Sequence, residues 1–268
     1  MTATSASPAT PAAPPPRTPA LPLRTRAAIL IRLLAIQGSW NYEILLGNGI
    51  GFCVEPALRL LPGGVGGERY RQALARQSQY FNAHPYLAGV AVGALARAEL
   101  DGEPAAKIER FRTALCGPLG SVGDRLVWAG WLPFCSLLAL AAFGFGAGPV
   151  AVLAIFLGVY NAGHFALRIW ALDAGWRGGM RVANALANPV LRRGPEHIVR
   201  AAACMAGIAL PLALNRTIDT GRAFTGVVLV AVAVGGVGLA RLQGRAEGWR
   251  IALGVLALFV LISVVRHG

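Results

Sequence analysis

The chain has 268 residues, of which 55% are hydrophobic and only 14% are charged. A soluble domain of average composition carries about 25% charged residues, so this composition excludes an ordinary soluble fold and favours an integral membrane protein. The net charge is +13, but the arginines stand at the ends of apolar runs, which suits orientation in a bilayer and excludes nucleic acid as a partner.

The N-terminal segment is composed mainly of alanine, proline, threonine and serine, and seven of its first 22 residues are prolines. Such a segment cannot bury enough apolar surface to fold, so residues 1–22 are predicted to form a disordered cytoplasmic tail. We expect residues 23–268 to form one membrane domain. Its first half, residues 38–128, carries interrupted apolar runs, and its second half, residues 129–268, carries the transmembrane helices.

Two apolar segments follow the tail. Residues 25–37 have the pattern of a basic amphipathic helix, with Arg26 and Arg32 flanking apolar positions, and are too short to cross a bilayer. We therefore expect this helix to lie in the membrane interface. The run at 44–61 is long enough to span, but glycines, an asparagine, a glutamate and a proline interrupt it. These interruptions favour a broken helix or a helical hairpin.

The next segments alternate between polar and apolar character. Residues 68–80 form a predicted polar helix at the cytoplasmic surface, whereas the apolar run at 86–96 is too short to cross a hydrocarbon core of about 30 Å. Apolar residues at positions 108, 111 and 115 indicate a second amphipathic helix. Glycines and a proline crowd residues 117–124, which are predicted to form irregular backbone at membrane depth. Residues 81–128 would then hold two short re-entrant segments joined by a surface helix.

Five later runs are long and apolar enough to span the membrane: residues 126–143, 149–167, 198–214, 223–240 and 249–265. Arginines are concentrated in the loops at 168–197 and 241–248. The positive-inside rule places these loops and the N-terminus in the cytoplasm and the C-terminus outside. The sequence therefore predicts an all-α integral membrane protein with an amphipathic N-terminal helix, broken or re-entrant hairpins and about five transmembrane helices.

The residues that usually bind metals are dispersed. The four cysteines lie in apolar surroundings without a Cys-x-x-Cys pair, and the four histidines have no ligand spacing to one another or to cysteine. We predict no metal site and no cofactor. The chain also lacks a clear nucleophile, which argues against a small intramembrane enzyme built on His84 and Asp124.

Three motifs follow one another in the first half of the chain. They are Trp40-Asn41-Tyr42-Glu43, then Phe81-Asn82-Ala83-His84-Pro85, and then Gly-Pro-Leu-x-x-Val-Gly-Asp at 117–124 with Trp128. In order and spacing they resemble the IID subunit of the mannose/fructose/sorbose family of phosphotransferase system (PTS) permeases. The resemblance covers about residues 38–180, and only the general hydrophobic pattern continues beyond residue 181.

The resemblance implies a function and partners. In this family a IID and a IIC subunit form one membrane unit through which a hexose-type sugar enters. A cytoplasmic IIB subunit, itself charged by IIA, phosphorylates the sugar. The phosphate-carrying histidines lie on the soluble subunits, so this chain is expected to be neither catalytic nor phosphorylated. We thus expect a hetero-oligomer in the lipid bilayer of a bacterial inner membrane.

Transport of a neutral sugar needs hydrogen-bond donors and acceptors in a water-accessible pocket, and the ends of discontinuous helices provide them. Asn82, His84 and Asp124 stand beside helix-breaking residues and are our candidates for binding the sugar or lining its path. Structural roles compete with this hypothesis. Asn82 and His84 could cap a helix that starts near Pro85, and Asp124 could pair with Arg125 or accept backbone hydrogen bonds in a glycine turn.

The other motif residues also have alternatives. Trp40 is either an interfacial anchor or a sugar-stacking ring, and Glu43 is a helix-end or subunit-interface charge. Asn41 and Trp128 complete the motif and interface candidates. The arginines between residues 177 and 200 fit orientation and lipid headgroup contact, with docking of IIB as the alternative.

One function from another class stays open, which is a membrane scaffold or sensor in a regulatory phosphotransferase branch without efficient transport. Neighbouring genes distinguish the two functions. Genes for IIA, IIB and IIC subunits favour transport, whereas soluble components without a IIC partner favour sensing.

Overall fold

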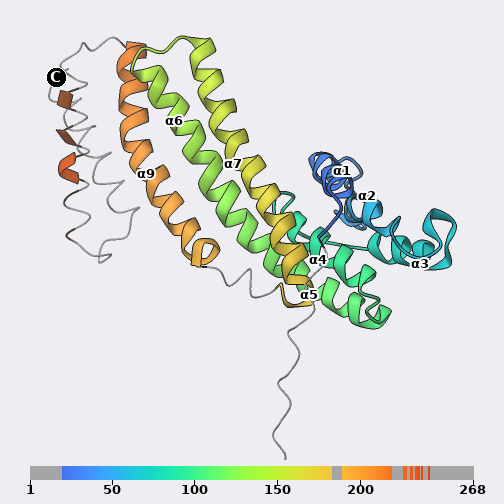
Figure 1. Ribbon diagram of the computed structural model, residues 1–268. Helices are drawn as coiled ribbons and strands as arrows, with labels where there is room; N and C mark the ends of the chain where they lie inside the picture. The colour runs from blue at the N-terminus through green and yellow to red at the C-terminus, as the bar shows by residue number, and fades with distance from the viewer. Residues whose placement is uncertain are drawn as a thin grey trace, which may run out of the picture. The chain divides into compact units, whose positions relative to one another are not determined.

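The computed structural model describes residues 20–182 and 189–218, together with isolated residues between 226 and 241. The described residues form helices joined by turns, and their β structure is limited to two isolated bridges (Figure 1). The prediction of an all-α fold is therefore confirmed. Contacts within the chain divide it into two compact units. Of the described residues, the first unit contains 20–115 and 169–182, and the second contains 116–168, 189–218 and the isolated positions that follow.

Among the described residues, three helical stretches are long and apolar enough to cross a membrane: Ala105–Gly144, Pro149–Arg181 and Leu191–Thr217. They contain the first three of the five predicted spans, and each is longer than predicted. The predicted spans at 223–240 and 249–265 lie outside the described residues, apart from isolated positions, and so does the predicted tail up to residue 19.

Short helices make up most of the first unit: α1 (Leu23–Leu34), α2 (Gly47–Leu58), α3 (Glu68–Gln77) and α4 (Ala88–Leu100). They have 12, 12, 10 and 13 residues, whereas crossing a bilayer takes about 20. α2 packs against α1, α3 and α4 and so forms the centre of the unit. The unit is completed by the 3-10 turns η1 (Gly64–Gly66) and η3 (Gly179–Arg181), the start of α5 (Ala105–Gly123) and the end of α7 (Pro149–Gly178).

The second unit is built from the longer helices. The end of α5 continues into a π-helical segment, η2 (Asp124–Trp131), and then into α6 (Leu132–Gly144). α6 packs along α9 (Pro189–Ile218), and the first two thirds of α7 belong to the same unit. The indole Nε1 of Trp131 donates to the carbonyl oxygen of Tyr160 at 3.3 Å, which ties the end of η2 to α7.

The run at 44–61 forms one short helix with turns on both sides, which is a broken helix rather than a hairpin. The glycines of α2 permit close packing. A Cβ atom on Gly49 would lie 1.9 Å from the carbonyl oxygen of Ile36, and one on Gly47 would lie 2.2 Å from that of Gln79. Neighbouring backbone therefore approaches α2 from two sides, and the helix is buried almost completely.

Residues 117–124 differ from the prediction, because they are helical rather than irregular. α5 runs through Gly117 and Pro118 to Gly123, and Asp124 begins η2. Proline removes one hydrogen bond from a helix, and wider π-helical turns accommodate such an interruption without ending the helix. The stretch 81–128 thus holds α4, α5 and part of η2, and the re-entrant placement of its short segments stays a prediction. The predicted loop at 168–197 is also largely helical, as the end of α7 and the start of α9.

Candidate functional site

The first two motifs meet in the first unit. The side-chain oxygen Oδ1 of Asn41 accepts hydrogen bonds from the backbone N–H groups of Glu43 and Ile44, both at 3.0 Å, and so closes a turn. The backbone of Phe81 then pairs with the end of this turn. Its N–H donates to the carbonyl of Ile44 at 3.1 Å, and its carbonyl accepts from the N–H of Leu46 at 2.9 Å. Two motifs that are forty residues apart in sequence are therefore one structural element.

Arg112 of α5 stabilises this element through contacts with the residues just before Phe81. Arg112 is 5% exposed, and its guanidinium donates to the carbonyl oxygens of Tyr80 at 2.8 Å and Gln79 at 2.5 Å. It also lies over the ring of Phe81, with 5.1 Å between the guanidinium carbon and the ring centroid. Arg112 also donates to the carbonyl oxygen of Gln77 at 3.1 Å, and a cation is favourable there because the C-terminal end of α3 carries partial negative charge. Sequence reasoning missed Arg112, since nothing in its own segment marks it.

Asn82 and His84 have different surroundings. Asn82 is exposed, whereas His84 is 2% exposed. The ring nitrogen Nδ1 of His84 accepts from the N–H of Tyr86 at 3.2 Å, and the His84 carbonyl accepts from Leu87 and Ala88 at 3.0 Å each. These contacts organise the turn that leads into α4, whose N-cap is Leu87 and has no side-chain cap, so the capping role of His84 stays a prediction.

The third motif lies in the second unit, where α5 ends and the π-helical segment η2 carries Asp124 and Trp128. Asp124 is exposed and Trp128 is 44% exposed. The Arg125 guanidinium donates to the carbonyl of Ser121 at 3.3 Å, and within the described part of the chain it makes no ion pair with Asp124. Neither structural alternative for Asp124 fits, because the expected glycine turn is a helix. π-Helical turns occur frequently at functional sites, so Asp124 stays a candidate.

The aromatic residues of the first motif are accessible. Trp40 is 44% exposed and Tyr42 is 88% exposed, and their rings meet edge to face at 4.8 Å between centroids. Glu43 is also exposed. An indole, a phenol and a carboxylate at one turn fit either the membrane interface or a partner subunit.

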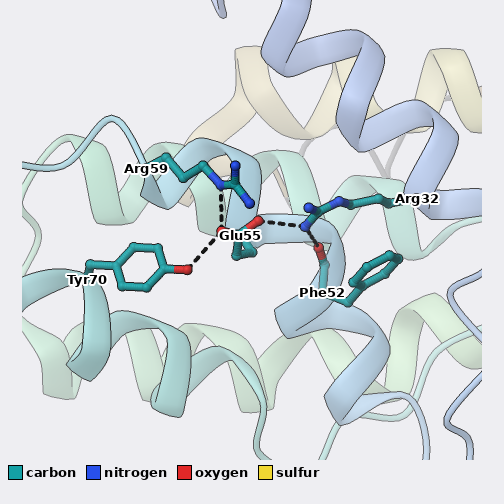
Figure 2. Close-up of polar contacts among 5 residues, drawn as sticks. All are labelled: Arg32, Phe52, Glu55, Arg59 and Tyr70. Atoms are coloured by element: carbon teal, nitrogen blue, oxygen red, sulfur yellow. Dashed lines mark hydrogen bonds and ion pairs between the residues drawn. The ribbon is translucent and has the colours of Figure 1, made fainter. Parts of the chain in front are cut away.

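Glu55 of α2 is the centre of a cluster that sequence reasoning described only as an interruption (Figure 2). It is 8% exposed, and its Oε2 accepts from Arg32 of α1 at 2.7 Å. Its Oε1 accepts from Arg59 at 2.6 Å and from the hydroxyl of Tyr70 on α3 at 2.8 Å. One carboxylate therefore ties α1 and α3 to α2. Arg32 also donates to the carbonyl of Phe52 at 2.7 Å and lies over its ring.

Electrostatics keep this carboxylate ionised. Desolvation raises the pKa of Glu55, but hydrogen bonds from Arg59, Tyr70 and Arg32 outweigh it and leave the pKa below its usual value. The same hydrogen bond to Glu55, together with burial, raises the pKa of Tyr70. The i,i+4 spacing of Glu55 and Arg59 was the available sequence signal, whereas the contribution of Arg32 depends on the tertiary fold.

A second buried carboxylate, Glu99 of α4, lies 5% exposed. Arg76 of α3 binds it with two nitrogens, at 3.0 and 2.8 Å, and the amide of Gln77 donates to it at 2.7 Å. Bidentate pairing of this kind is the strongest that arginine makes with a carboxylate. Both clusters hold helices together. In the described part of the chain no three His, Cys, Asp or Glu side chains gather to hold a metal ion.

Comparison with known proteins gives a consistent result. The family model described as "PTS system mannose/fructose/sorbose family IID component" matches residues 21–220. The chain is 27% identical over 176 residues to the mannose-specific EIID component of Escherichia coli K12, covering 63% of this chain and 60% of the relative. It is 29% identical over 179 residues to the fructose permease IID component of Bacillus subtilis, covering 63% and 62%. The chain thus spans about 60% of the length of the curated relatives it matches.

Two solved structures share the fold. One is titled as the mannose transporter ManYZ in complex with microcin E492, with a TM-score of 0.55 and 18% identity over 92% of this chain and 97% of that one. The other, titled only as a membrane protein, has a TM-score of 0.57 and 20% identity over 91% and 97%. At these identities the likeness concerns the fold alone.

Proposed function

Because this chain belongs to the mannose/fructose/sorbose family of PTS IID components, we propose that it is a membrane subunit of a sugar phosphotransferase permease. The observation that carries the proposal is the family match over residues 21–220, which includes all three motifs. The three long apolar helices fit the same role. The relatives are named for mannose and for fructose at nearly equal identity, so the substrate class is a hexose-type sugar without further assignment.

The partners follow from the family. We propose that the chain forms the sugar path together with a IIC subunit, and that a IIB subunit charged by IIA phosphorylates the sugar during uptake. The chain itself carries out no covalent step and receives no phosphate. The exposed apolar stripe of α7, which includes Val150, Leu153 and Leu157, supports a position where lipid or another membrane subunit covers it.

The candidate residues would form hydrogen bonds with the sugar and take part in no covalent step. An exposed amide on Asn82 offers two donors and an acceptor, and the carboxylate of Asp124 offers acceptors, which is what sugar hydroxyls need. His84, which is buried, would act by shaping the backbone between Phe81 and α4. We also propose the bacterial inner membrane as the location, with a cytoplasmic N-terminus and an extracytoplasmic C-terminus, on the basis of the arginine distribution.

Complementation tests the proposal. Cells that lack their own mannose-family IID subunit are given this chain with IIA, IIB and IIC subunits of its family, and uptake of several labelled hexoses is measured. We expect uptake of at least one hexose that depends on this chain and on IIB. A stable complex with IIC that takes up none of them would contradict transport and favour the scaffold or sensor function.

Two substitutions then test the site. Asn82→Ala and Asp124→Asn should lower uptake at least about tenfold while the complex with IIC still assembles, since each removes hydrogen bonds to the sugar. The matched controls are Asn48→Ala, another exposed asparagine of the first unit, and Asp101→Asn, another exposed aspartate. Loss of assembly in the two site variants would assign Asn82 and Asp124 to structure instead.

A further inference from the structure

A cavity of about 250 Å³ opens in the first unit between α1 and the C-terminal end of α7. Its lining combines charged and apolar groups: Leu21, Arg26, Asp173, Trp176 and Arg177. None of the three motifs contributes to it. The cavity is therefore a feature that the proposed sugar path does not explain.

The charges in the cavity are unbalanced. Asp173 accepts from Arg26 at 2.9 Å and from Arg177 at 3.3 Å, so one carboxylate is shared by two guanidinium groups and the cluster carries a net charge of +1. The Nε of Arg26 is shielded from solvent and has no hydrogen-bond partner within the described part of the chain. Arg177 is 80% exposed and can turn toward an added anion. Guanidinium donors of this kind match the geometry of phosphate.

The length of α7 agrees with a cavity at the level of lipid headgroups when the hydrocarbon core begins at the start of that helix. α7 begins at Pro149, and about 20 residues at 1.5 Å each cross a hydrocarbon core of about 30 Å. Asp173 stands 24 residues after Pro149, which corresponds to about 36 Å along the helix. The cavity residues on α7 then lie just beyond the core, where tryptophan is enriched as well.

The outer face of α1 is apolar and accessible. Leu23, Ile31 and Leu34 are 79%, 68% and 51% exposed, and their spacing puts them on one side of the helix. A different side, with Ile29 and Leu33, is fully buried in the unit. Arg26 follows Leu23 by three positions and so lies beside the exposed stripe. A helix with one apolar face outward and arginines next to it is typical of membrane interfaces.

We propose that this cavity binds the phosphate of an anionic phospholipid through Arg26 and Arg177, with the acyl chains lying along the Leu23–Ile31–Leu34 stripe of α1. Arg26 and Arg177 provide the donors, Trp176 borders the headgroup, and Asp173 holds the two guanidiniums while it limits their charge. The inference rests on the membrane placement of the chain and does not depend on sugar transport.

Native mass spectrometry of the full chain in neutral detergent tests the site. Phosphatidylglycerol and phosphatidylcholine are titrated separately, and the occupancy of one-lipid adducts is measured. We expect phosphatidylglycerol to bind more tightly. The double variant R26Q/R177Q should bind it at least about tenfold more weakly, the scale expected for two arginines near an anionic headgroup. The control R69Q/R71Q removes the same charge from exposed positions on α3 and should leave binding unchanged.

Asp173→Asn should change phosphatidylglycerol binding in the direction opposite to R26Q/R177Q. It removes the carboxylate that competes for both guanidiniums, so phosphatidylglycerol should bind several-fold more tightly, whereas a merely structural cluster would bind less. Arg177→Gln alone, at an exposed position, serves if the double variant does not fold. Equal loss in R26Q/R177Q and its control would overturn the proposal, as would weaker binding in Asp173→Asn. Displacement of the lipid by millimolar inorganic phosphate would overturn the lipid as the ligand and leave an anion site.

Discussion

The two units of the chain are stabilised in different ways. Nearly all of the buried polar side chains among the described residues lie in the first unit: Glu55, Gln77, His84, Glu99 and Arg112, whereas the second unit has Arg168. Close apolar contacts hold the second unit, whereas the first unit has close contacts in addition to its polar clusters. A Cβ atom on Gly144 would lie 2.5 Å from that of Leu212, and one on Gly163 would lie 2.5 Å from the ring of Trp131.

The difference follows from the lengths of the helices in the two units. In the first unit the helices are too short to span, and ion pairs between them supply specific contacts that short apolar faces cannot. In the second unit the helices can span, and exposed apolar side chains suit a lipid or protein environment. A buried charge in such a chain is therefore not by itself a sign of a transport path.

The largest expected effect comes from breaking a buried pair in the first unit. Glu99→Leu leaves the guanidinium of Arg76 buried without its carboxylate and should cost about 3–5 kcal/mol. Thermal unfolding and assembly with IIC would measure the loss. The matched control Glu68→Leu removes a solvent-exposed pair with Arg71 and should leave stability almost unchanged. Equal losses would contradict the role of burial.

Removing both partners sharpens this test. Glu99→Leu combined with Arg76→Met takes away the unpaired charge, so most of the lost stability should return. If the double variant is as unstable as Glu99→Leu, the unpaired guanidinium of Arg76 is not the source of the lost stability.

Close packing gives the next largest effect, and it should appear in both units. Gly175→Ala would place a Cβ 2.2 Å from the carbonyl oxygen of Val90 on α4, and Gly144→Ala would place one 2.5 Å from the Leu212 Cβ on α9. Each should cost roughly 1–3 kcal/mol because backbone must move. Hydrogen exchange should report the loss in the unit that carries the substitution. A loss spread equally over both units would argue against two separate packing systems.

The two units should differ in how much stability they lose at low pH. The folded-state pKa of Glu55 lies below its ordinary value of 4.5, so its contribution to stability is present above pH 4.5 and is lost as the pH falls through the folded pKa. Hydrogen exchange below pH 4.5 should therefore show the first unit opening before the second. Glu55→Gln should remove this part of the acid sensitivity. An unchanged pH profile in that variant would show that Glu55 is not responsible.

The smallest effect is expected at glycines that have open space around them. A Cβ on Gly117 or on Gly158 would meet nothing within 4 Å. Both positions are helical, so alanine there should raise the free energy of unfolding by up to about 1 kcal/mol. If Gly117→Ala lowers uptake while it leaves stability intact, the third motif needs this glycine for motion or for a partner.

Much of the fold could be predicted from the sequence, because long apolar runs indicate membrane spans and helical periodicity indicates amphipathic helices. The helix at 25–37, the polar helix at 68–80 and three spans were predicted near their observed positions. The glycines were interpreted less well. In α2 and at 117–124 they were expected to break helices, but they lie inside helices, and in α2 they permit close approach of other backbone.

The motif residues of the site could be predicted from the sequence, but the arginines that hold their surroundings in place could not. Asn41, Phe81 and His84 were marked by pattern, and the structure joins their segments. Arg112, Arg32 and Arg76 act on residues more than twenty positions away, so no local pattern identifies them. The roles of Asn82 and Asp124 stay predictions, because a sugar path shared with another subunit is not encoded in one chain.

Reconstituted transport tests the central claim most directly. Vesicles that contain this chain with its IIC subunit are supplied with IIA, IIB, the general phosphotransferase proteins and phosphoenolpyruvate, and the accumulation of labelled hexose phosphate inside is measured. We predict accumulation that requires phosphoenolpyruvate, IIB and this chain together. A stable complex that accumulates no hexose phosphate, or accumulation that persists when this chain is omitted, would contradict its role as a permease subunit.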